Sequence, residues 1–265
     1  MNKGLQMKAK ALIFSYILVL LSCLYSEAFS REIPFSPGEK MTFRVRWAFV
    51  TAGEATLEFM PYEKYEGIDS CRFVFTARTT EFVDMFYKVR DRIESYTDRD
   101  ITKSLFYHKH HDGKSLKEAT VRFDWNENLA RYSDLNGIRE PLEITPGTFD
   151  PLSVFYAFRL YLKEDNSDSD IYVSDGKKHI TGRAEVIRRE KIRVDEKEYD
   201  TLLVEPEMEN IGGVFEKSGN AKLKIWVTND DLRLPVMIKS KVAVGSFVAE
   251  LVSYESGIES ADTEE

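Results

Sequence analysis

The chain has very little cysteine, with only Cys23 and Cys71 among its 265 residues. If the N-terminal segment is removed beyond Cys23, Cys71 remains alone and cannot form an internal disulfide. The sequence therefore predicts a fold without disulfide cross-links. Cys71 lies in an apolar, strand-like stretch with no reactive groups around it. It is interpreted as a small buried hydrophobic residue rather than as a nucleophile.

Catalytic and cofactor motifs are also lacking. The sequence contains no G-x-S-x-G elbow, no Walker A loop and no dinucleotide-binding fingerprint. We therefore assign no catalytic residue and expect no cofactor. Carboxylates are abundant, at 45 Asp and Glu. A glycosidase pair stays open as an alternative, although no spacing singles one out.

Long apolar runs are absent except at the N-terminus, where residues 11–21 (ALIFSYILVLL) follow three lysines, Lys3, Lys8 and Lys10. A membrane-spanning helix needs about 20 apolar residues, so this run has the length of a signal peptide instead. Small residues at Ser26, Ala28 and Ser30 offer cleavage positions. We predict that residues 1–30 are a secretory signal and that the protein is exported to the bacterial periplasm.

Residues 20–23 (LLSC) support a second interpretation of this segment, because they resemble a bacterial lipobox. In that case Cys23 would carry a lipid and tether the mature protein to a membrane. Leu21 is bulky at a position where a small residue is usual, so plain cleavage near Ala28 or Ser30 is favoured.

The charge of the chain is strongly acidic, at −8 formally. Removal of residues 1–30 leaves 34 basic and 44 acidic side chains, a net charge of −10. Such a surface repels nucleic acids and anionic membrane surfaces. We therefore expect no nucleic-acid partner.

Alternation of polar and apolar residues runs through most of residues 31–255, which we interpret as a single β-rich domain followed by an acidic disordered tail at 256–265. The segment 41–49, for example, is apolar at every odd position. We expect about a dozen antiparallel strands, including long ones at 85–96 and 242–254, the latter with a bulge at Gly245. So many strands favour a strongly curved sheet, a barrel or a half-barrel.

One segment, about 150–163, departs from this alternation and predicts a central α-helix. Asp150 suits an N-cap and Pro151 a first helical position. The helix is apolar on nearly all sides, so we expect it to be buried against the concave side of the sheet.

Aromatic residues of one strand parity provide candidates for a ligand groove facing that helix. The strand candidates are Phe43, Trp47, Phe59, Phe73 and Phe75, and the helix candidates are Phe155 and Arg159. The competing interpretation is that these side chains simply fill a closed core, because barrels of this size hold either side chains or one small ligand.

Two charged residues occupy otherwise apolar positions. Asp91 shares the parity of core-facing residues, so it either pairs with Arg90 or Arg92 or is turned outward by a bulge. Arg159 lies on the apolar helix, where it forms a structural ion pair, snorkels to the edge of the core or grips an anionic head group.

His108 and His110 are the only histidine pair with metal-ligand spacing, since i and i+2 share one face of a strand. A solvated hairpin tip before Asp112-Gly113 is the favoured interpretation, because no Glu-x-x-His pattern supports a metal. We assign no metal site.

Several strings together resemble one family of exported bacterial proteins, the domain-of-unknown-function family 3108. The strings are 34–39 (PFSPGE), 43–47 (FRVRW), 52–55 (AGEA), 149–153 (FDPLS) leading to Arg159, and 226–228 (WVT) with Asp230, Arg233, Pro235 and Gly245-Ser246. The resemblance spans residues 33–255. It implies a periplasmic or outer-membrane-associated β protein and carries no activity and no catalytic residues.

The function expected from these observations is non-enzymatic binding of a lipid or another amphipathic envelope molecule in the concave face of the sheet. One alternative is a structural or assembly factor that contacts another envelope protein, for example through strand addition at an open sheet edge. The other is the glycan-active hydrolase. The ligand, the oligomeric state and the choice between an open and a closed barrel are left open by the sequence.

Overall fold

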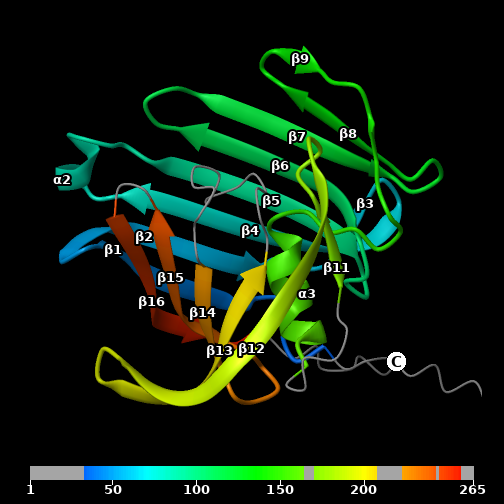
Figure 1. Cartoon of the computed structure of the whole chain (residues 1–265). Coiled ribbons are helices and arrows are strands. Elements are labelled where there is room, and N and C mark those ends of the chain that lie inside the picture. Colours follow the sequence, from blue (N-terminus) through cyan, green and yellow to red (C-terminus); the bar gives the residue numbers. More distant parts are fainter. Residues whose placement is uncertain (1–32, 164–169, 208–222, 243–244, 258–265) are drawn as a thin grey trace, which may run out of the picture. The chain divides into compact units, whose positions relative to one another are not determined.

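Antiparallel strands dominate the structure, as the alternation predicts. The computed structural model describes residues 33–163, 170–207, 223–242 and 245–257. The predicted signal segment, Cys23 and residues 258–265 of the predicted tail lie outside these described residues. The chain from Pro34 onward forms one compact unit, shown in Figure 1.

The described strands pair into one 16-stranded sheet in the order β10-β8-β7-β6-β5-β4-β2-β1-β16-β15-β14-β13-β12-β11, with β3 beside β4 and β9 beside β8. Their bounds are β1 Lys40–Trp47, β2 Val50–Phe59, β3 Glu63–Tyr65, β4 Ile68–Thr79, β5 Arg90–Asp98, β6 Ser104–Asp112, β7 Lys117–Asp124, β8 Leu129–Asp134, β9 Gly137–Ile138, β10 Leu142–Glu143, β11 Ile171–Ser174, β12 His179–Val194, β13 Lys197–Glu207, β14 Leu223–Thr228, β15 Pro235–Val242 and β16 Gly245–Glu255. The end strands β10 and β11 are not neighbours in this order, so the described sheet is open.

The sheet curls strongly, and its β11 end lies against the inner side of β7 and β8 (Figure 1). Gly176, in the β11–β12 turn, has a φ of 78°, and a Cβ there would lie only 2.8 Å from Val121 Cγ2. A parallel bridge between Phe149 and Val173 also connects this end to the segment before the helix. A large part of the concave side is therefore occupied by the protein's own chain.

The helix α3 (Ser153–Tyr161) lies on the concave side of the sheet (Figure 1). It is shorter than the predicted 150–163, because residues 151 and 152 form a turn. Asp150 nevertheless caps this turn, since its Oδ1 accepts from the backbone N–H groups of Leu152 and Ser153 at 2.8 and 3.0 Å. Tyr156 of α3 stacks on Phe73 of β4 with ring centroids 3.8 Å apart.

Two predicted strands need correction. The strand expected at 85–96 begins only at Arg90, because residues 81–84 form a short helix, α2 (Glu81–Asp84), whose first turn is capped by Thr80. Gly245 is not a bulge: β15 ends at Val242, which pairs with Gly245 at the start of β16. The bulge of β16 lies instead between Ser253 and Leu251, which pair with the consecutive residues Thr42 and Phe43 of β1.

Candidate functional site

Three of the six aromatic residues predicted to line a groove are core residues. Phe43, Phe59 and Phe73 are 2%, 1% and 0% exposed, and Phe59 and Phe73 contact Tyr156 of α3. Phe75 and Phe155 are half-buried. Phe43, Phe59 and Phe73 thus fill the core instead of lining a groove.

Arg159 forms a buried ion pair with Glu39, which sequence reasoning missed as a partner. Its two terminal nitrogens lie 2.6 and 2.8 Å from the carboxylate oxygens of Glu39, and the side chains are 2% and 0% exposed. Arg159 Nε also donates to the carbonyl of Leu232 at 3.0 Å. The Tyr254 hydroxyl lies 3.2 Å from Glu39 Oε1. This position on α3 belongs to the core and leaves Arg159 no access to a head group.

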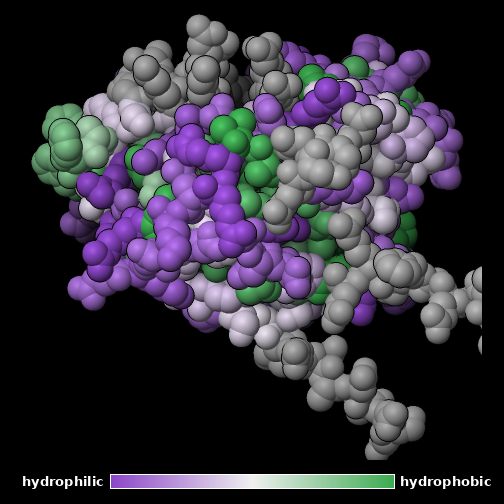
Figure 2. Space-filling view, turned by 60° about the horizontal axis from the view of Figure 1, so that its bottom comes forward, coloured by the Kyte–Doolittle hydropathy of each residue, from purple (hydrophilic) through white to green (hydrophobic). Residues whose placement is uncertain are grey.

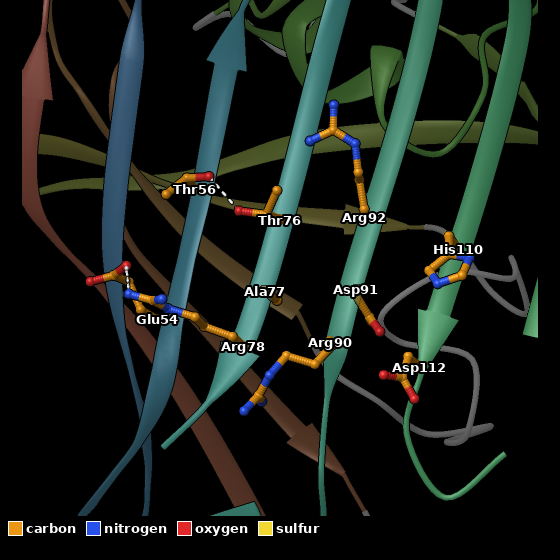
Figure 3. Close-up of a pocket in the computed structure, with 10 residues that line it drawn as sticks. All are labelled: Glu54, Thr56, Thr76, Ala77, Arg78, Arg90, Asp91, Arg92, His110 and Asp112. Atoms are coloured by element: carbon orange, nitrogen blue, oxygen red, sulfur yellow. Dashed lines mark hydrogen bonds and ion pairs between the residues drawn. The ribbon is translucent and has the colours of Figure 1, made fainter. Parts of the chain in front are cut away.

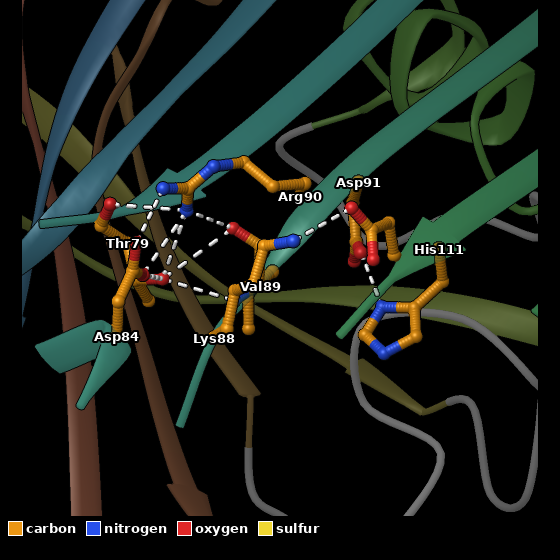
Figure 4. A network of polar contacts seen from close by, with 8 residues as sticks. Thr79, Asp84, Lys88, Val89, Arg90, Asp91 and His111 are labelled. Carbon is orange, nitrogen blue, oxygen red and sulfur yellow. Dashed lines mark hydrogen bonds and ion pairs between the residues drawn. The ribbon is translucent and has the colours of Figure 1, made fainter. Parts of the chain in front are cut away.

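Asp91 faces the inner side of the sheet, between Ala77 and His111 and with no register shift. Its carboxylate contacts Nδ1 of His111 (Figure 4). The partner is therefore neither Arg90 nor Arg92, and no bulge turns the side chain outward. The reason is the register, which places His111 directly opposite Asp91 on the neighbouring strand.

His108 and His110 lie on the other, outer face of β6, as their i and i+2 spacing requires. His108 Nε2 lies 3.0 Å from Glu118 Oε1, whereas His110 lines a cavity. Within the described ranges, no group of three or more His, Cys, Asp or Glu residues is arranged to hold a metal ion.

That cavity, of about 390 Å³, lies on the outer face across β2, β4, β5 and β6 (Figure 3). The register builds it from two cross-strand rows: Glu54, Arg78, Arg90 and Asp112 in one, and Thr56, Thr76, Arg92 and His110 in the other. Even-numbered residues of β2, β4, β5 and β6 share this face because strand side chains alternate. The hydroxyls of Thr56 and Thr76 lie 2.7 Å apart between the strands.

A second cavity, of about 520 Å³, adjoins the first and shares Glu54, Arg78 and Arg90 with it. It extends to Thr51 of β2 and to Thr80 and Glu81 at the start of α2. We call the two cavities together the rim groove. Both volumes lie within the range of about 300–1,000 Å³ that is usual for small-molecule sites, although such sites are usually more apolar.

Arg90 fixes the segment that carries α2 (Figure 4). Its guanidinium contacts both carboxylate oxygens of Asp84, at 3.1 and 2.5 Å. It also donates to the carbonyls of Thr79 and Val89 at 3.2 and 2.7 Å. The hydrogen bond from Arg90 holds the pKa of Asp84 below its ordinary value, and the hydroxyl of Thr79 adds to the effect. The loop from 80 to 89 is therefore held in a defined position.

This clamped loop exposes large apolar side chains to solvent, and so does the neighbouring β1–β2 turn. The exposed fractions are 59% for Phe82, 70% for Met85, 72% for Phe86 and 52% for Tyr87 in the loop, and 43% for Trp47, 94% for Phe49 and 45% for Val50 in the turn. We call these seven residues the apolar rim. Figure 2 shows hydrophobic residues gathered at the left edge of the molecule, the side on which α2 lies in Figure 1.

The two parts of the apolar rim are joined by backbone contacts. Thr80 N–H donates to the carbonyl of Ala52 at 2.9 Å, and Gly53 pairs with Thr79. A Cβ at Gly53 would lie 2.2 Å from the carbonyl oxygen of Arg78, so only glycine permits this approach. The rim groove reaches the base of both parts, since it is lined by Thr51 next to Val50 and by Glu81 next to Phe82.

The chain matches one protein family in sequence and is similar in fold to a solved structure. A family described as "Protein of unknown function (DUF3108)" matches residues 42–252. The chain belongs to the DUF3108 family. No curated protein matches this DUF3108 chain. A solved structure, a β-barrel-like protein of domain of unknown function DUF1849 from Brucella abortus, is similar to it with a TM-score of 0.53 and 10% identity, over 84% of this chain and 98% of that one. At this identity the likeness shows the fold alone.

Neither helix in the described part of this DUF3108 protein is long and apolar enough to cross a membrane. The rim groove and the apolar rim were missed by sequence reasoning. The signals were present: Arg78, Arg90 and Arg92 share one parity on neighbouring strands, and residues 82–87 (FVDMFY) are apolar or aromatic except for Asp84 and do not alternate.

Proposed function

We propose that the protein is a non-enzymatic binding protein of the bacterial cell envelope that holds an amphipathic molecule, such as a lipid, at its rim. The observation that carries this proposal is the continuity of the rim groove with the apolar rim. A charged, hydroxyl-lined cavity ends at the base of two loops that expose seven large apolar side chains. An amphipathic molecule matches both surfaces at once.

The energetics of the apolar rim support a binding role. Large exposed apolar patches on a soluble protein mark interaction sites. The clamp formed by Arg90 keeps the α2 loop from turning its apolar side chains inward. Burying one phenyl ring is worth about 1.5–3 kcal/mol. A ligand that covers two of these rings therefore gains about 3–6 kcal/mol, a large share of the roughly 8 kcal/mol that micromolar binding requires.

The alternatives receive less support from the same geometry. Strand addition needs a long free edge. The end strands β10 and β11 have only two and four residues, so the one long edge open to it is that of β12, whose residues 183–194 pair with β13 alone among the described strands. A glycosidase needs two carboxylates across a cleft. In the rim groove, Glu54 pairs with Arg78 and Asp112 pairs with Lys88.

Export to the periplasm remains part of the proposal and rests on the basic, apolar and small-residue pattern of residues 1–30. Under this proposal the ligand is a molecule of the cell envelope. Tethering through a lipid on Cys23 is the alternative form of the same proposal.

The test is a lipid-binding titration of the full chain, made by expression with its own N-terminus and purified from the periplasm. Native mass spectrometry first detects any lipid that co-purifies. Oleoyl lysophosphatidylcholine below its micelle concentration is then titrated while tryptophan fluorescence is recorded. We expect a blue shift, because Trp47 is 43% exposed in the apolar rim, whereas Trp226 is 6% exposed.

A double variant, Phe49→Ser with Phe86→Ser, should lower the affinity at least tenfold, since each lost ring contributes about 1.5–3 kcal/mol. The matched control is Leu135→Ser with Ile138→Ser, which changes two exposed apolar residues (60% and 87%) at the β8–β9 end of the sheet. Equal affinity of both double variants and the unchanged protein would refute the proposal, as would the absence of any lipid binding.

A further inference from the structure

The two strands at the centre of the rim groove place three arginines side by side. In the pairing of β4 with β5, Arg78 lies opposite Arg90 and Thr76 lies opposite Arg92. Like charges directly opposite one another on a strand pair are destabilising. A cross-strand pair of arginines on an open face therefore needs an anion nearby to offset its repulsion.

Asp84 supplies this anion for Arg90, whereas Glu54 supplies it only weakly for Arg78. Arg90 is fully engaged by Asp84 and by backbone carbonyls. Arg78 is 70% exposed, and its contact with Glu54 is long, at 3.4 Å. Such an exposed, long ion pair contributes little.

Arg92 can also form further hydrogen bonds. It is 50% exposed and contacts Glu94 through Nε at 2.8 Å. Glu94 is also held by Arg72 at 2.8 Å, so this carboxylate is shared between two arginines. Among the described residues, no hydrogen bond or ion pair involves the two terminal nitrogens of Arg92.

We propose that the rim groove binds an anionic group of the phosphate class, contacted by Arg78 and Arg92. This inference rests on the proposed function and assigns the head group of the amphipathic ligand. Diagonal neighbours on adjacent strands lie about 7–8 Å apart, within the reach of long side chains. The two guanidinium groups point apart in Figure 3, Arg78 toward Glu54, so both side chains must rotate to hold one phosphate, whose oxygens their forks match in geometry. The hydroxyls of Thr56 and Thr76 are hydrogen-bonded to each other and leave one donor hydrogen beside Arg92.

The acidic net charge of the chain does not oppose this assignment. A net charge of −8 repels extended anionic surfaces, whereas a single phosphate can lie at the arginines of the groove, Arg78 and Arg92. The groove is also lined by four carboxylates, those of Glu54, Glu81, Asp91 and Asp112. Glu54 is the acidic residue that competes with the phosphate for Arg78. Its removal should therefore strengthen binding.

The experiment compares three probes on the full chain by calorimetry at low salt: inorganic phosphate, oleoyl glycerol phosphate and oleoyl glycerol, which lacks the phosphate. We expect oleoyl glycerol phosphate to bind about tenfold or more tightly than oleoyl glycerol, since one charge-assisted hydrogen bond is worth roughly that factor. Arg78→Ala and Arg92→Ala should each remove about this tenfold advantage. Each variant should lower the affinity for oleoyl glycerol phosphate by about tenfold more than it lowers the affinity for oleoyl glycerol.

The control is Arg131→Ala, an exposed and ion-paired arginine of β8 outside the groove, which should change no affinity. Glu54→Gln should raise the affinity for oleoyl glycerol phosphate. Circular dichroism checks that each variant is folded. If inorganic phosphate competes with oleoyl glycerol phosphate and also binds alone, the source of the anion can be either a lipid or free phosphate. If it binds only within the acylated probe, a lipid head group is the ligand.

The outcomes separate the two proposals. Equal binding of the two acylated probes, or Arg variants that keep the full advantage, overturns the phosphate site but leaves binding at the apolar rim intact. Failure of both acylated probes overturns the proposed function. Phosphate binding that Arg78→Ala abolishes would then still establish an anion site independent of lipid.

Discussion

The ion pair between Arg159 and Glu39 permits a quantitative prediction about stability. Both side chains are almost completely buried, and two nitrogen–oxygen contacts of 2.6 and 2.8 Å join them. Removing one partner leaves an uncompensated charge in the core, which costs about 3–5 kcal/mol. Arg159→Met should therefore lower the free energy of unfolding by this amount, and so should Glu39→Met.

The double variant, Glu39→Met with Arg159→Met, is expected to behave differently. It leaves no buried charge, and a well-packed apolar pair is often as stable as the ion pair it replaces. The carbonyl of Leu232 and the hydroxyl of Tyr254 lose their partners, but both residues are only partly buried and can reach water. We therefore expect a total loss of about 1–3 kcal/mol, well below the sum of the single losses.

The assay is urea unfolding of the four proteins at neutral pH, followed by tryptophan fluorescence and circular dichroism. The four free energies give a coupling energy of at least about 2 kcal/mol if the reasoning is correct. Single variants that each cost under about 0.5 kcal/mol, or losses that simply add, would show that the charges reach water and that the pair is not a core element.

Further predictions concern four other positions. Asp150→Asn should cost about 2 kcal/mol in urea unfolding, because the buried carboxylate accepts three serine hydroxyls and two backbone N–H groups. Tyr156→Phe should raise the unfolding free energy by about 1 kcal/mol, because its buried hydroxyl has no hydrogen-bond partner among the described residues; a loss would contradict this. The pKa of Asp84 is lowered in the folded protein, so its ionised carboxylate stabilises the fold at pH values above 3.8, and this stabilisation is lost as the pH falls below 3.8. Asp84→Asn should therefore lower the urea midpoint at pH 7 and make that midpoint less dependent on pH in acid. Gly53→Ala should lower the melting temperature, since its Cβ would clash with a carbonyl of the next strand; an unchanged value would contradict the close approach.

The sequence predicts the fold class well because strand alternation is a local property. In β1 and β2 the buried residues Met41, Phe43, Ala55, Leu57 and Phe59 recur at every second position, and this can be recognised without knowing what lies opposite. The described ranges hold 16 strands rather than about a dozen, because β3, β9 and β10 have only two or three residues. Such short strands carry no periodic signal.

The partners of the buried charges could not be predicted, because they depend on tertiary register. Asp91 shares the parity of core residues, which identified it as unusual. Its neighbour His111 follows only from the pairing of β5 with β6, which places the two residues opposite each other. Glu39 lies 120 residues from Arg159 in the chain, so the ion pair forms only after α3 packs inside the sheet.

The location of the candidate site follows from how the interior is filled. A curved sheet with one helix suggests a hollow interior, and the odd-parity aromatics predict a lining for it. Tyr156, however, stacks directly on Phe73, and the β11–β12 turn at Gly176 packs against Val121 and Tyr132. Apolar side chains that can still contact a ligand are therefore those that the fold exposes at the loops. The loop from 80 to 89 exposes them because Arg90 binds Asp84 and the backbone on both sides of it. The same arginine row lines the rim groove, so one set of residues both holds the apolar rim in place and forms the charged surface beside it.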